Sequence, residues 1–488
     1  MIDSIDIRTI PVKKLFNGAH LKHNHTQMKV AFHTLGCKVN HYETEAIKEA
    51  FVSRGAEAVS EEEFADVYII NTCTVTNIAD RKSRQFIRRA KRMNPDAVIA
   101  VTGCYAQVAS DEIAAMPEVD LIVGNGRKSE ICGLVMQKMQ KARAEEQPDK
   151  GTASSEDHPA EDAGHADVLV LPRSELTDYE DMGQVTSAGE GMIRAYLKIQ
   201  DGCDRFCSYC LIPYARGPVR SRPKDEIIDE IRGMLRNGFR EIVLTGINTA
   251  LYGTEDGADC SLSELLTEID DMESPDGADF RIRLSSLEPT VVDKDNVEEI
   301  IRHKRLCHHL HLSVQSGSSS VLRSMNRHYS REEYLEIVRA IRDYDPLFGI
   351  TTDIIVGFPG ESQDDFNDSL DIVRQAGFGR THVFRYSPRK GTAGAAMKDA
   401  VPESIKKERA AVLERLGSET AEDFIKANSG TVQTVLIEEW ADGYATGYTG
   451  NYIKVYIHDP ERRLEAGEFV KAATEDAFMD GAIACLAK

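Results

Sequence analysis

The chain has 488 residues, a formal net charge of −21 and 41% hydrophobic residues. This length is too great for one ordinary domain, so we expect two or three. No apolar run approaches the roughly 18 residues that a membrane span needs, which excludes a membrane protein. No apolar stretch follows Lys13 and Lys14, so we expect a cytoplasmic protein that has no secretory signal and begins with a loose extension over residues 1–27.

About half of the acidity is concentrated in one segment. Residues 145–190 contain 13 acidic residues against only Lys150 and Arg173, and they are rich in Gly, Ala, Ser and Pro. Such a composition buries too little apolar surface to offset the entropy of ordering. We therefore predict an acidic interdomain linker at 145–190, and the overall charge does not exclude a nucleic-acid partner.

The ten cysteines indicate metal or redox chemistry, because thiols stay reduced in the cytoplasm. Cys203, Cys207 and Cys210 form C-x-x-x-C-x-x-C in the run KIQDGCDRFCSYCLIPYARG. A zinc knuckle is the alternative, but zinc normally takes four ligands, and no fourth Cys or His lies at ordinary ligand spacing. Three thiolates can instead hold three irons of a 4Fe-4S cluster and leave the fourth iron open to a small molecule.

Six strand patterns alternate with helical patterns between residues 191 and 427, which predicts a partial parallel (β/α)6 barrel. Catalytic groups of such barrels follow the carboxyl ends of the strands. A polar turn follows each of the six strands here. One such turn is ordinary, but six in succession indicate a binding site. The strands are predicted at 193–199, 241–245, 280–287, 309–314, 350–356 and 381–386.

The N-terminal region, residues 28–144, carries a second group of cysteines. Apolar strand patterns at 28–34, 66–71 and 97–102 are each followed by a helical stretch, which predicts a doubly wound α/β domain. Cys37, Cys73 and Cys104 each follow one of these strands. Ligands of α/β folds bind at this edge of the sheet, so we predict a second three-cysteine cluster, with three ordinary small turn residues as the alternative.

A basic helix is predicted in the same domain, starting near Asp80 and ending before Pro95. Its seven positive charges have no acid among them, and Phe86, Ile87 and Ala90 supply the buried side. A charged helix face is commonly only solvated, but like charges beside a cluster cysteine favour contact with RNA phosphates. The predicted RNA-binding residues are Arg81, Lys82, Arg84, Arg88, Arg89 and Arg92, with Lys91 the seventh charge of the helix.

The C-terminal region, residues 428–488, shows short alternating strands joined by Gly and Asn turns, which predicts a small antiparallel β-barrel. It contains ten acidic and five basic residues, so RNA contact here would require a local basic patch. Stacking on bases is one interpretation of its aromatic residues, and ordinary core is the other. These residues are Trp440, Tyr444, Tyr448 and Tyr452.

The cysteine loop at 203–210 resembles the radical S-adenosylmethionine (SAM) superfamily. In that superfamily the open iron binds the amino and carboxylate groups of SAM, and the reduced cluster cleaves SAM to a radical that abstracts hydrogen from the substrate. The resemblance implies SAM contacts from the turns after the strands and from the aromatic residue before the last cysteine. Carried onto this sequence, they are Tyr209, Thr245, Gly246, Asn248, Ser286, Glu288, Gln315, Asp353, Gly357 and Pro359.

Two three-cysteine sites on one chain resemble the methylthiotransferase family, from Met28 to the C-terminus. The resemblance implies two 4Fe-4S clusters, with Cys37, Cys73 and Cys104 holding the one that supplies sulfur, and a C-terminal TRAM domain. It also implies an electron donor such as a flavodoxin or ferredoxin. No side chain is assigned as a general base, because hydrogen abstraction by a radical does not require one.

The runs TLGCKVNHYETEAI and NTCTVTNIADRKSRQ are similar to the branch that acts on N6-threonylcarbamoyladenosine at position 37 of the tRNA anticodon loop, in tRNAs that decode ANN codons. The base must leave its stack to reach the barrel. The alternatives are isopentenyladenosine tRNA and a ribosomal-protein aspartate as substrates. From a different class, the chain could be an Fe-S electron carrier or an RNA-binding sensor.

Overall fold

The computed structural model describes residues 27–146, 166–185, 193–289 and 293–487, so the extension predicted at 1–27 lies almost entirely outside the described residues. The chain divides into two compact units. The first comprises residues up to Val185 together with Ile212–Pro218, and the second comprises Thr186–Leu211 and Val219–Lys488. No helix in the described part of the chain is long and apolar enough to cross a membrane.

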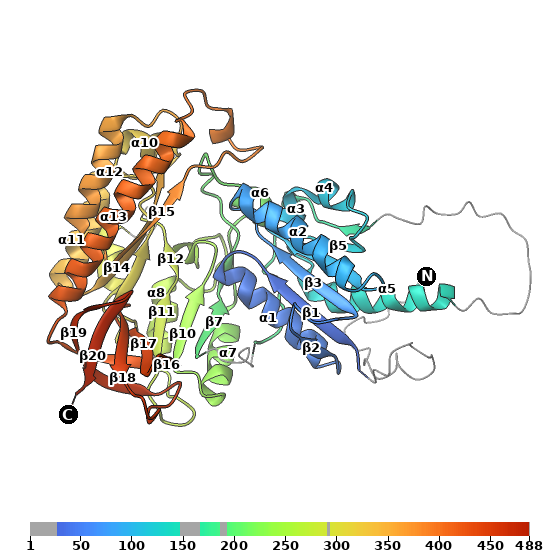
Figure 1. The fold of residues 1–488 in the computed structure, drawn as a ribbon, viewed down its shortest axis with the longest axis horizontal. Coiled ribbons are helices and arrows are strands. Elements are labelled where there is room, and N and C mark those ends of the chain that lie inside the picture. Colours follow the sequence, from blue (N-terminus) through green and yellow to red (C-terminus); the bar gives the residue numbers. More distant parts are fainter. Residues whose placement is uncertain (1–26, 147–165, 186–192, 290–292, 488) are drawn as a thin grey trace, which may run out of the picture. The chain divides into compact units, whose positions relative to one another are not determined.

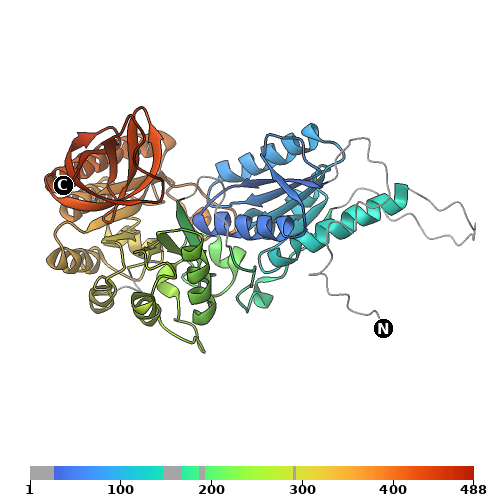
Figure 2. The same ribbon diagram turned by 90° about the horizontal axis from the view of Figure 1, so that it is seen from below.

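The first unit contains a six-stranded parallel sheet in the order β2-β1-β3-β4-β5-β6. Helices α1 and α5 bury one apolar core against one face, and α2, α3 and α4 bury another against the opposite face (Figures 1 and 2). The strands are β1 (Lys29–Thr34), β2 (Glu57–Val59), β3 (Val67–Thr72), β4 (Val98–Gly103), β5 (Leu121–Val123) and β6 (Asp167–Leu169). The helices are α1 (Lys38–Val52), α2 (Asn77–Met93), α3 (Cys104–Val108), α4 (Ser110–Ala114), η3 (Lys128–Glu130), α5 (Ile131–Glu146), η4 (Arg173–Glu175) and α6 (Ile212–Arg216).

The three strands predicted in this region are present as β1, β3 and β4, which lie side by side at the centre of the sheet. In the second half of the predicted linker, the structure shows a short strand that belongs to the sheet. Strand β6 pairs with β5, and Gln107 Nε2 donates to the backbone oxygen of Leu171 at 2.7 Å. Composition indicated disorder because the segment is acidic, whereas backbone pairing at a sheet edge requires no apolar side chains.

The second unit begins with parallel β/α units whose strands form two sheets. One sheet has the order β11-β10-β7 and the other β12-β13-β14-β15, while β8 and β9 form a separate antiparallel pair. The strands are β7 (Arg194–Lys198), β8 (Gln200–Asp201), β9 (Arg220–Ser221), β10 (Glu241–Thr245), β11 (Arg281–Leu284), β12 (Ser286–Leu287), β13 (His309–Leu312), β14 (Gly349–Val356) and β15 (Arg380–Arg385). The helices are α7 (Lys224–Arg236), η5 (Thr249–Leu251), α8 (Leu262–Asp271), α9 (Lys294–Ile300), α10 (Ser319–Ser324), α11 (Arg331–Tyr344), α12 (Gln363–Ala376), η6 (Gly394–Ala396) and α13 (Glu403–Ala427).

These elements confirm the predicted radical-SAM-type barrel, with one local difference. The third predicted strand is interrupted at Ser285 and divides into β11 and β12, so the parallel strands fall into two sheets. An isolated bridge between Ile282 and Leu306 lies at this junction. The carboxyl ends of the strands, where the site was predicted, keep their order along the chain.

A closed five-stranded barrel ends the chain, in the order β16-β17-β18-β20-β19. It buries a compact apolar core that includes Val435, Ile437, Val455 and Ala472. The small β-barrel predicted from the alternating pattern is therefore confirmed, and its strands pair antiparallel except for β18 and β20, which are parallel. Its strands are β16 (Val432–Ala441), β17 (Tyr444–Thr449), β18 (Lys454–His458), β19 (Phe469–Phe478) and β20 (Gly481–Leu486).

Buried arginines join this small barrel to the amino ends of β10 and β11. Glu241 pairs with Arg281 at 2.6 Å and with Arg283 at 2.7 Å. Arg281 also donates to the backbone oxygens of Thr434 and Tyr448, and Arg283 donates to those of Thr449 and Gly450, all within 3.2 Å. One carboxylate thus neutralises two guanidinium groups that bind the backbone of the C-terminal barrel.

Replacing Glu241 with Gln should lower the free energy of unfolding of the second unit by about 3–5 kcal/mol, because two buried cations lose their counter-ion. Burial raises the pKa of Glu241, but Arg283 and Arg281 lower it more, to about 2. A depressed pKa stabilises the fold above the ordinary value of 4.5, and this stabilisation disappears as the pH falls towards 2. In thermal unfolding, the difference in stability between the wild type and Glu241→Gln should be constant above pH 5 and should shrink below it.

The matched control is Glu298→Gln, which removes a half-exposed carboxylate whose partner Arg302 lies 3.7 Å away. This control should change the free energy of unfolding by less than about 1 kcal/mol. Equal effects of the two substitutions, or an advantage of Glu241 that grows on acidification, would contradict the account of Glu241.

Candidate functional site

The three cysteines of the loop follow β7 and β8, at the carboxyl end of the first barrel strand. The backbone N–H of Cys210 donates to the carbonyl of Cys207 at 2.9 Å, which turns the loop back on itself. Ser208 fixes the loop to the end of α10, since its N–H and hydroxyl donate to the carbonyls of Met325 and Ser324. The chain therefore presents the thiols from an anchored loop.

The thiols of this loop lie close enough to influence one another. Burial, together with the neighbouring Cys207, raises the pKa of Cys203 to about 12. Burial also raises the pKa of Cys207, against the lowering effect of Arg327. Without a metal these groups are neutral thiols, so metal binding must release protons from them. Such thiols are suited to ligating iron and are not activated nucleophiles.

A chain of polar groups connects the loop to the turns after β10 and β12. Tyr209 accepts from Arg327 at 3.0 Å, and Arg327 pairs with Glu288 at 2.7 Å. Glu288 accepts from Asn248 Nδ2 at 2.9 Å, and the Asn248 N–H donates to Gln200 at 3.1 Å. The structure thus brings together three of the predicted SAM contacts: Tyr209, Asn248 and Glu288. Arg327 and Gln200 were not predicted as part of this site, although Gln200 lies three residues before Cys203.

The residues after β10 have features that fit a bound SAM. Asn248 Oδ1 is buried and has no hydrogen-bond partner in the described part of the chain, and such an acceptor suits an ammonium group. A Cβ on Gly246 would lie 2.8 Å from Gln200 Oε1, so any larger residue in this turn would have to displace the side chain of Gln200. Thr245 is buried, and its carbonyl accepts from the N–H of Ile199 at 2.9 Å.

The remaining predicted contacts lie on the neighbouring strands. Gly357 has a φ of +75°, and its N–H donates to the carboxylate of Glu361, which pairs with Arg409. Pro359 is buried and Ser286 is exposed. The side chain of Asp353 contacts Ser313 and His311 on β13 and the segment just after it. Gln315 has a φ of +65°, and its N–H donates to the backbone oxygen of Asp353 at 2.9 Å.

The second group of cysteines lies at the carboxyl ends of β1, β3 and β4. Because these strands are parallel and in register, Cys37, Cys73 and Cys104 follow them at one edge of the sheet. Cys73 and Cys104 are buried and Cys37 is exposed. Burial, together with the neighbouring Cys104 and Cys37, raises the pKa of Cys73 to about 12. The three thiols therefore form one electrostatic group, as a shared cluster requires.

Glycines precede two of these cysteines because the backbone approaches very closely. A Cβ on Gly36 would lie 2.8 Å from Cys73 Cβ, and one on Gly103 would lie 2.3 Å from the carbonyl oxygen of Thr72. Both glycines have positive φ, +115° and +95°, where any other side chain is strained. The local sequence Gly-Cys at both positions is what a tight three-thiol site requires.

A buried ion-pair network supports this second site. Arg216 is completely buried, and its Nε donates to Cys104 Sγ at 3.3 Å. Its terminal nitrogens donate to Glu43 at 2.7 Å and to Asn40 at 2.7 Å, and Lys128 also pairs with Glu43. Donors around the sulfurs stabilise thiolates and tune a cluster. The sequence did not reveal this network, although Arg216 lies only six residues after Cys210.

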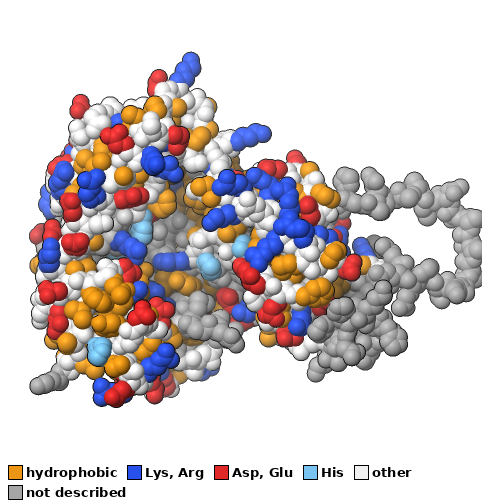
Figure 3. All heavy atoms as spheres, in the orientation of Figure 1, with side chains coloured by type: hydrophobic (Ala, Val, Ile, Leu, Met, Phe, Trp, Pro, Cys, Tyr) orange, Lys and Arg blue, Asp and Glu red, His pale blue; other side chains and the backbone are white. Residues whose placement is uncertain are grey.

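The basic helix is present as α2, with Phe86, Ile87 and Ala90 buried as predicted. Figure 3 shows Lys and Arg side chains gathered over it. Acidic residues that are distant in the sequence pair with part of this charge, which the sequence could not show. The pairs are Arg84–Glu112 (2.9 Å), Arg88–Glu118 (3.9 Å), Arg89–Glu62 (2.8 Å) and Lys91–Asp120 (3.3 Å). Arg81, Lys82 and Arg92 are exposed, and no ion pair is found for them among the described residues.

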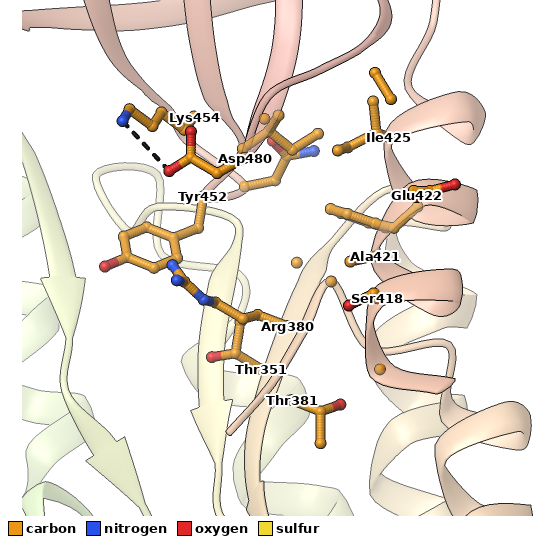
Figure 4. A pocket seen from close by; sticks show the side chains of 18 of the residues that line it. Thr351, Arg380, Thr381, Ser418, Ala421, Glu422, Ile425, Tyr452, Lys454 and Asp480 are labelled. Atoms are coloured by element: carbon orange, nitrogen blue, oxygen red, sulfur yellow. Dashed lines mark hydrogen bonds and ion pairs between the residues drawn. The ribbon is translucent and has the colours of Figure 1, made fainter. Parts of the chain in front are cut away.

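The aromatic residues of the C-terminal barrel differ in their surroundings. Tyr448 and Tyr452 stack on each other with ring centroids 5.0 Å apart, and Arg194 and Arg283 lie over their respective rings. They pack between the two barrels of the second unit, which supports ordinary core. A cavity of about 730 Å³ adjoins Tyr452 (Figure 4), between α13, the amino ends of β14 and β15, and the small barrel. The cavity therefore lies at the amino ends of the barrel strands, whereas the SAM site is predicted at their carboxyl ends.

Comparison with known proteins identifies the class. Residues 197–373 match the family model of the radical SAM superfamily, and residues 29–124 match the model described as uncharacterized protein family UPF0004. A solved structure of the radical SAM methyltransferase TsrM from Kitasatospora setae covers 90% of this chain and 84% of its own, with a TM-score of 0.51 and 14% identity, which supports the fold alone. The protein is a radical SAM enzyme, a class that uses SAM and a 4Fe-4S cluster.

Two curated relatives narrow this further. The threonylcarbamoyladenosine tRNA methylthiotransferase MtaB of Bacillus subtilis is 40% identical over 91% of this chain and 92% of its own. The tRNA-2-methylthio-N(6)-dimethylallyladenosine synthase of Carboxydothermus hydrogenoformans is 36% identical over 83% of this chain and 87% of its own. The chain belongs to the radical SAM methylthiotransferase family, which confirms the resemblance inferred from its cysteines.

Proposed function

We propose that the protein replaces the hydrogen on C2 of N6-threonylcarbamoyladenosine, at position 37 of the anticodon loop of tRNAs that decode ANN codons, with a methylthio group. The observation that carries this proposal is the presence of two separate three-thiol sites, one in each unit. The names of relatives such as the Bacillus subtilis enzyme support the choice of substrate. The substrate places the reaction in the cytoplasm.

The residues divide between two tasks. Cys203, Cys207 and Cys210 would hold the radical cluster, and Cys37, Cys73 and Cys104 the cluster that supplies sulfur. When bound, these clusters and SAM supply the radical, the sulfur and the methyl group. Because a radical cluster must be reduced before each turnover, we also propose a small electron-transfer protein, such as a flavodoxin or ferredoxin, as a partner.

The chain itself supplies positioning. Asn248 and the turn at Gly246 would orient the amino end of SAM, Tyr209 would pack beside its adenine, and Glu361 holds the backbone at Gly357. In the first unit, Arg216 would hold Cys104 Sγ in a fixed position. None of these side chains is required to move a proton from the substrate.

The proposal is tested by the tRNA nucleosides of a strain that lacks the gene. Mass spectrometry should show that the 2-methylthio form of N6-threonylcarbamoyladenosine disappears while the unmodified parent accumulates, and a plasmid copy should restore it. An unchanged level of the methylthio form would contradict the proposal. Loss of the methylthio form of dimethylallyladenosine instead would favour the activity named for the Carboxydothermus relative.

We further propose that tRNA phosphates contact the exposed, unpaired charges of α2. Replacing Arg81, Lys82 and Arg92 together with Ala should weaken tRNA binding about tenfold or more and reduce the salt dependence of binding by a slope of about 2–3. The control replaces Arg232, Arg302 and Lys304 with Ala, which are exposed charges on the second unit. Fluorescence anisotropy at several salt concentrations would measure the tRNA affinity and its salt dependence for both variants. Equal losses of affinity in the two variants would refute a specific role of α2.

A further inference from the structure

Three polar side chains meet inside the radical SAM barrel, on three neighbouring parallel strands. His311 of β13, Asp353 of β14 and His382 of β15 offer ligand atoms that all lie within 4.8 Å of one another, and all three residues are half-buried. Asp353 and His382 are directly paired in the strand register, and His311 is paired with Thr351. We call these three residues the lumen cluster.

The cluster is held in place by neighbouring hydroxyl groups. His311 Nε2 lies 3.2 Å from Asp353 Oδ2, and its Nδ1 lies 2.9 Å from the hydroxyl of Thr351. The hydroxyl of Ser313 donates to Asp353 at 3.1 Å and lies 3.0 Å from His311 Nε2. Burial raises the pKa of Asp353, but His311, Ser313 and His382 lower it to a net value below the ordinary one. Asp353 is therefore a carboxylate at neutral pH, flanked by two imidazoles.

Successive side chains of a strand point to opposite faces of the sheet, and this places the cluster on the inner side of the barrel. The hydroxyls of Thr352 and of Tyr334 on α11 both donate to the carbonyl oxygen of Leu312, and Thr381 lies against Gly417 of α13, so these threonines face the outer helices. Their neighbours Asp353 and His382 face the other side. Helices α11 and α13 run along the outside of β14 and β15 in Figure 1.

The interior of the barrel is accessible at this level. Phe384, two residues beyond His382 on the same face of β15, is 46% exposed. Arg380, two residues before His382, is also exposed, and Figure 4 shows its guanidinium beside the ring of Tyr452. Closed barrel interiors are filled by branched apolar side chains. An accessible interior lined by His, Asp, Ser, Thr and Arg is instead a place for a polar ligand.

The cluster lies beneath the predicted SAM site. His311 lies on β13, which ends at Leu312, three residues before Gln315. The backbone oxygen of Asp353 accepts from the N–H of Gln315 at 2.9 Å, so the cluster and this turn are directly connected. A base whose C2 faces the radical would therefore have its N6 substituent within reach of the interior.

The two substrate classes named among the relatives differ in this substituent. A threonylcarbamoyl group carries a carboxylate, a hydroxyl and a urea, whereas a dimethylallyl group is apolar. An apolar group placed against the half-buried lumen cluster would displace water from its polar atoms without replacing the lost hydrogen bonds, at a cost of about 1–3 kcal/mol for each group. Sites that hydrogen-bond their substrate reject analogues lacking the polar group by about 10⁴-fold or more.

We propose that the lumen cluster binds the anionic, hydroxyl-bearing substituent on N6 of the target adenosine, and that His382 determines the choice of this substituent over an apolar one. This inference rests on the proposed function and adds the residues that select the substrate. The imidazoles and the hydroxyls of Ser313 and Thr351 supply hydrogen bonds to the carboxylate, the hydroxyl and the urea of this substituent.

The test compares kcat/KM on anticodon stem-loop RNAs carrying either threonylcarbamoyladenosine or dimethylallyladenosine, using reconstituted holoenzyme. His382→Phe keeps a ring of similar size but removes its hydrogen bonds. It should lower the ratio of the two kcat/KM values, threonylcarbamoyl over dimethylallyl, at least tenfold. His382→Asn, which keeps a donor, should restore part of the ratio. The control His308→Phe replaces a histidine paired with Asp345 outside the cluster and should leave the ratio unchanged.

Several results would overturn the inference. An unchanged ratio in His382→Phe would do so, as would an equal loss on both RNAs, which indicates a general structural role. Metal analysis of the wild-type holoenzyme tests whether the cluster is instead a zinc site, since two imidazoles and a carboxylate also suit zinc. One zinc per chain that is lost in His382→Phe would replace the proposal with a metal site. If wild-type enzyme does not act on the threonylcarbamoyl RNA at all, the proposed function itself fails.

Discussion

Replacing Cys207 with Ala should abolish SAM cleavage and all product formation, and it should lower the iron content from about eight to about four atoms per chain. Two thiolates cannot hold a cluster that is otherwise fixed by three. The remaining cysteines of the second unit lie outside the loop at 203–210 and cannot replace Cys207; they are Cys260, Cys307 and Cys485. The measurements are iron per chain after reconstitution and the amount of 5′-deoxyadenosine formed with SAM and a strong reductant.

The matched control for this prediction is Cys485→Ala, because Cys485 is an exposed cysteine at the end of the C-terminal barrel. It should keep the full iron content and normal SAM cleavage. Residual 5′-deoxyadenosine formation in Cys207→Ala at more than a small fraction of the wild-type level would show that the loop is not the radical site.

Replacing Cys73 with Ala should separate the two halves of the reaction. The auxiliary cluster should be lost, so the iron content again falls to about four atoms per chain, but 5′-deoxyadenosine should still form because Cys203, Cys207 and Cys210 are intact. The methylthio nucleoside should fall below detection, since no sulfur is supplied. Chromatography of both products from a single reaction measures this separation directly.

Cys132→Ala is the control in the same unit. Cys132 is buried in the apolar core beside α1 and α5 and does not contact the three-thiol group, so this variant should lose some stability but no iron. A Cys73→Ala enzyme that retains about eight irons, or that still forms the methylthio nucleoside, would remove the sulfur-donating role from this site.

The sequence was sufficient to predict the three-part architecture, and it also supports the proposal of two cysteine sites. Apolar periodicity indicates β/α units, and parallel strands bring their carboxyl ends to one edge, so Cys37, Cys73 and Cys104 could be grouped without coordinates. The pattern of Cys203, Cys207 and Cys210 is local and needs no tertiary information. The fold confirms the architecture, and the relatives confirm the family.

Features that depend on long-range contacts were not predictable. Arg216 reaches Cys104 and Glu43 through a segment that packs with the first unit although it follows the loop of the second. The charge of α2 looked unopposed, yet Glu62 and Glu112 pair with it from other elements. Strand β6 formed where composition indicated only a linker, because a sheet edge selects strands by backbone pairing.

The lumen cluster illustrates the same limit. His311, Asp353 and His382 are separated by more than 25 residues from one to the next, and only the register of β13, β14 and β15 brings them together. The sequence singled out Asp353 as a SAM contact because it lies near a glycine-rich turn. No sequence motif marks its partners His311 and His382 as site residues.

One reaction tests the central claim most directly. Purified protein with both clusters reconstituted is given SAM, a low-potential reductant and tRNA carrying N6-threonylcarbamoyladenosine, and both products are quantified. We expect the 2-methylthio form of this nucleoside to appear together with 5′-deoxyadenosine, and neither to appear without reductant. Formation of 5′-deoxyadenosine with no methylthio nucleoside on this tRNA would contradict the account.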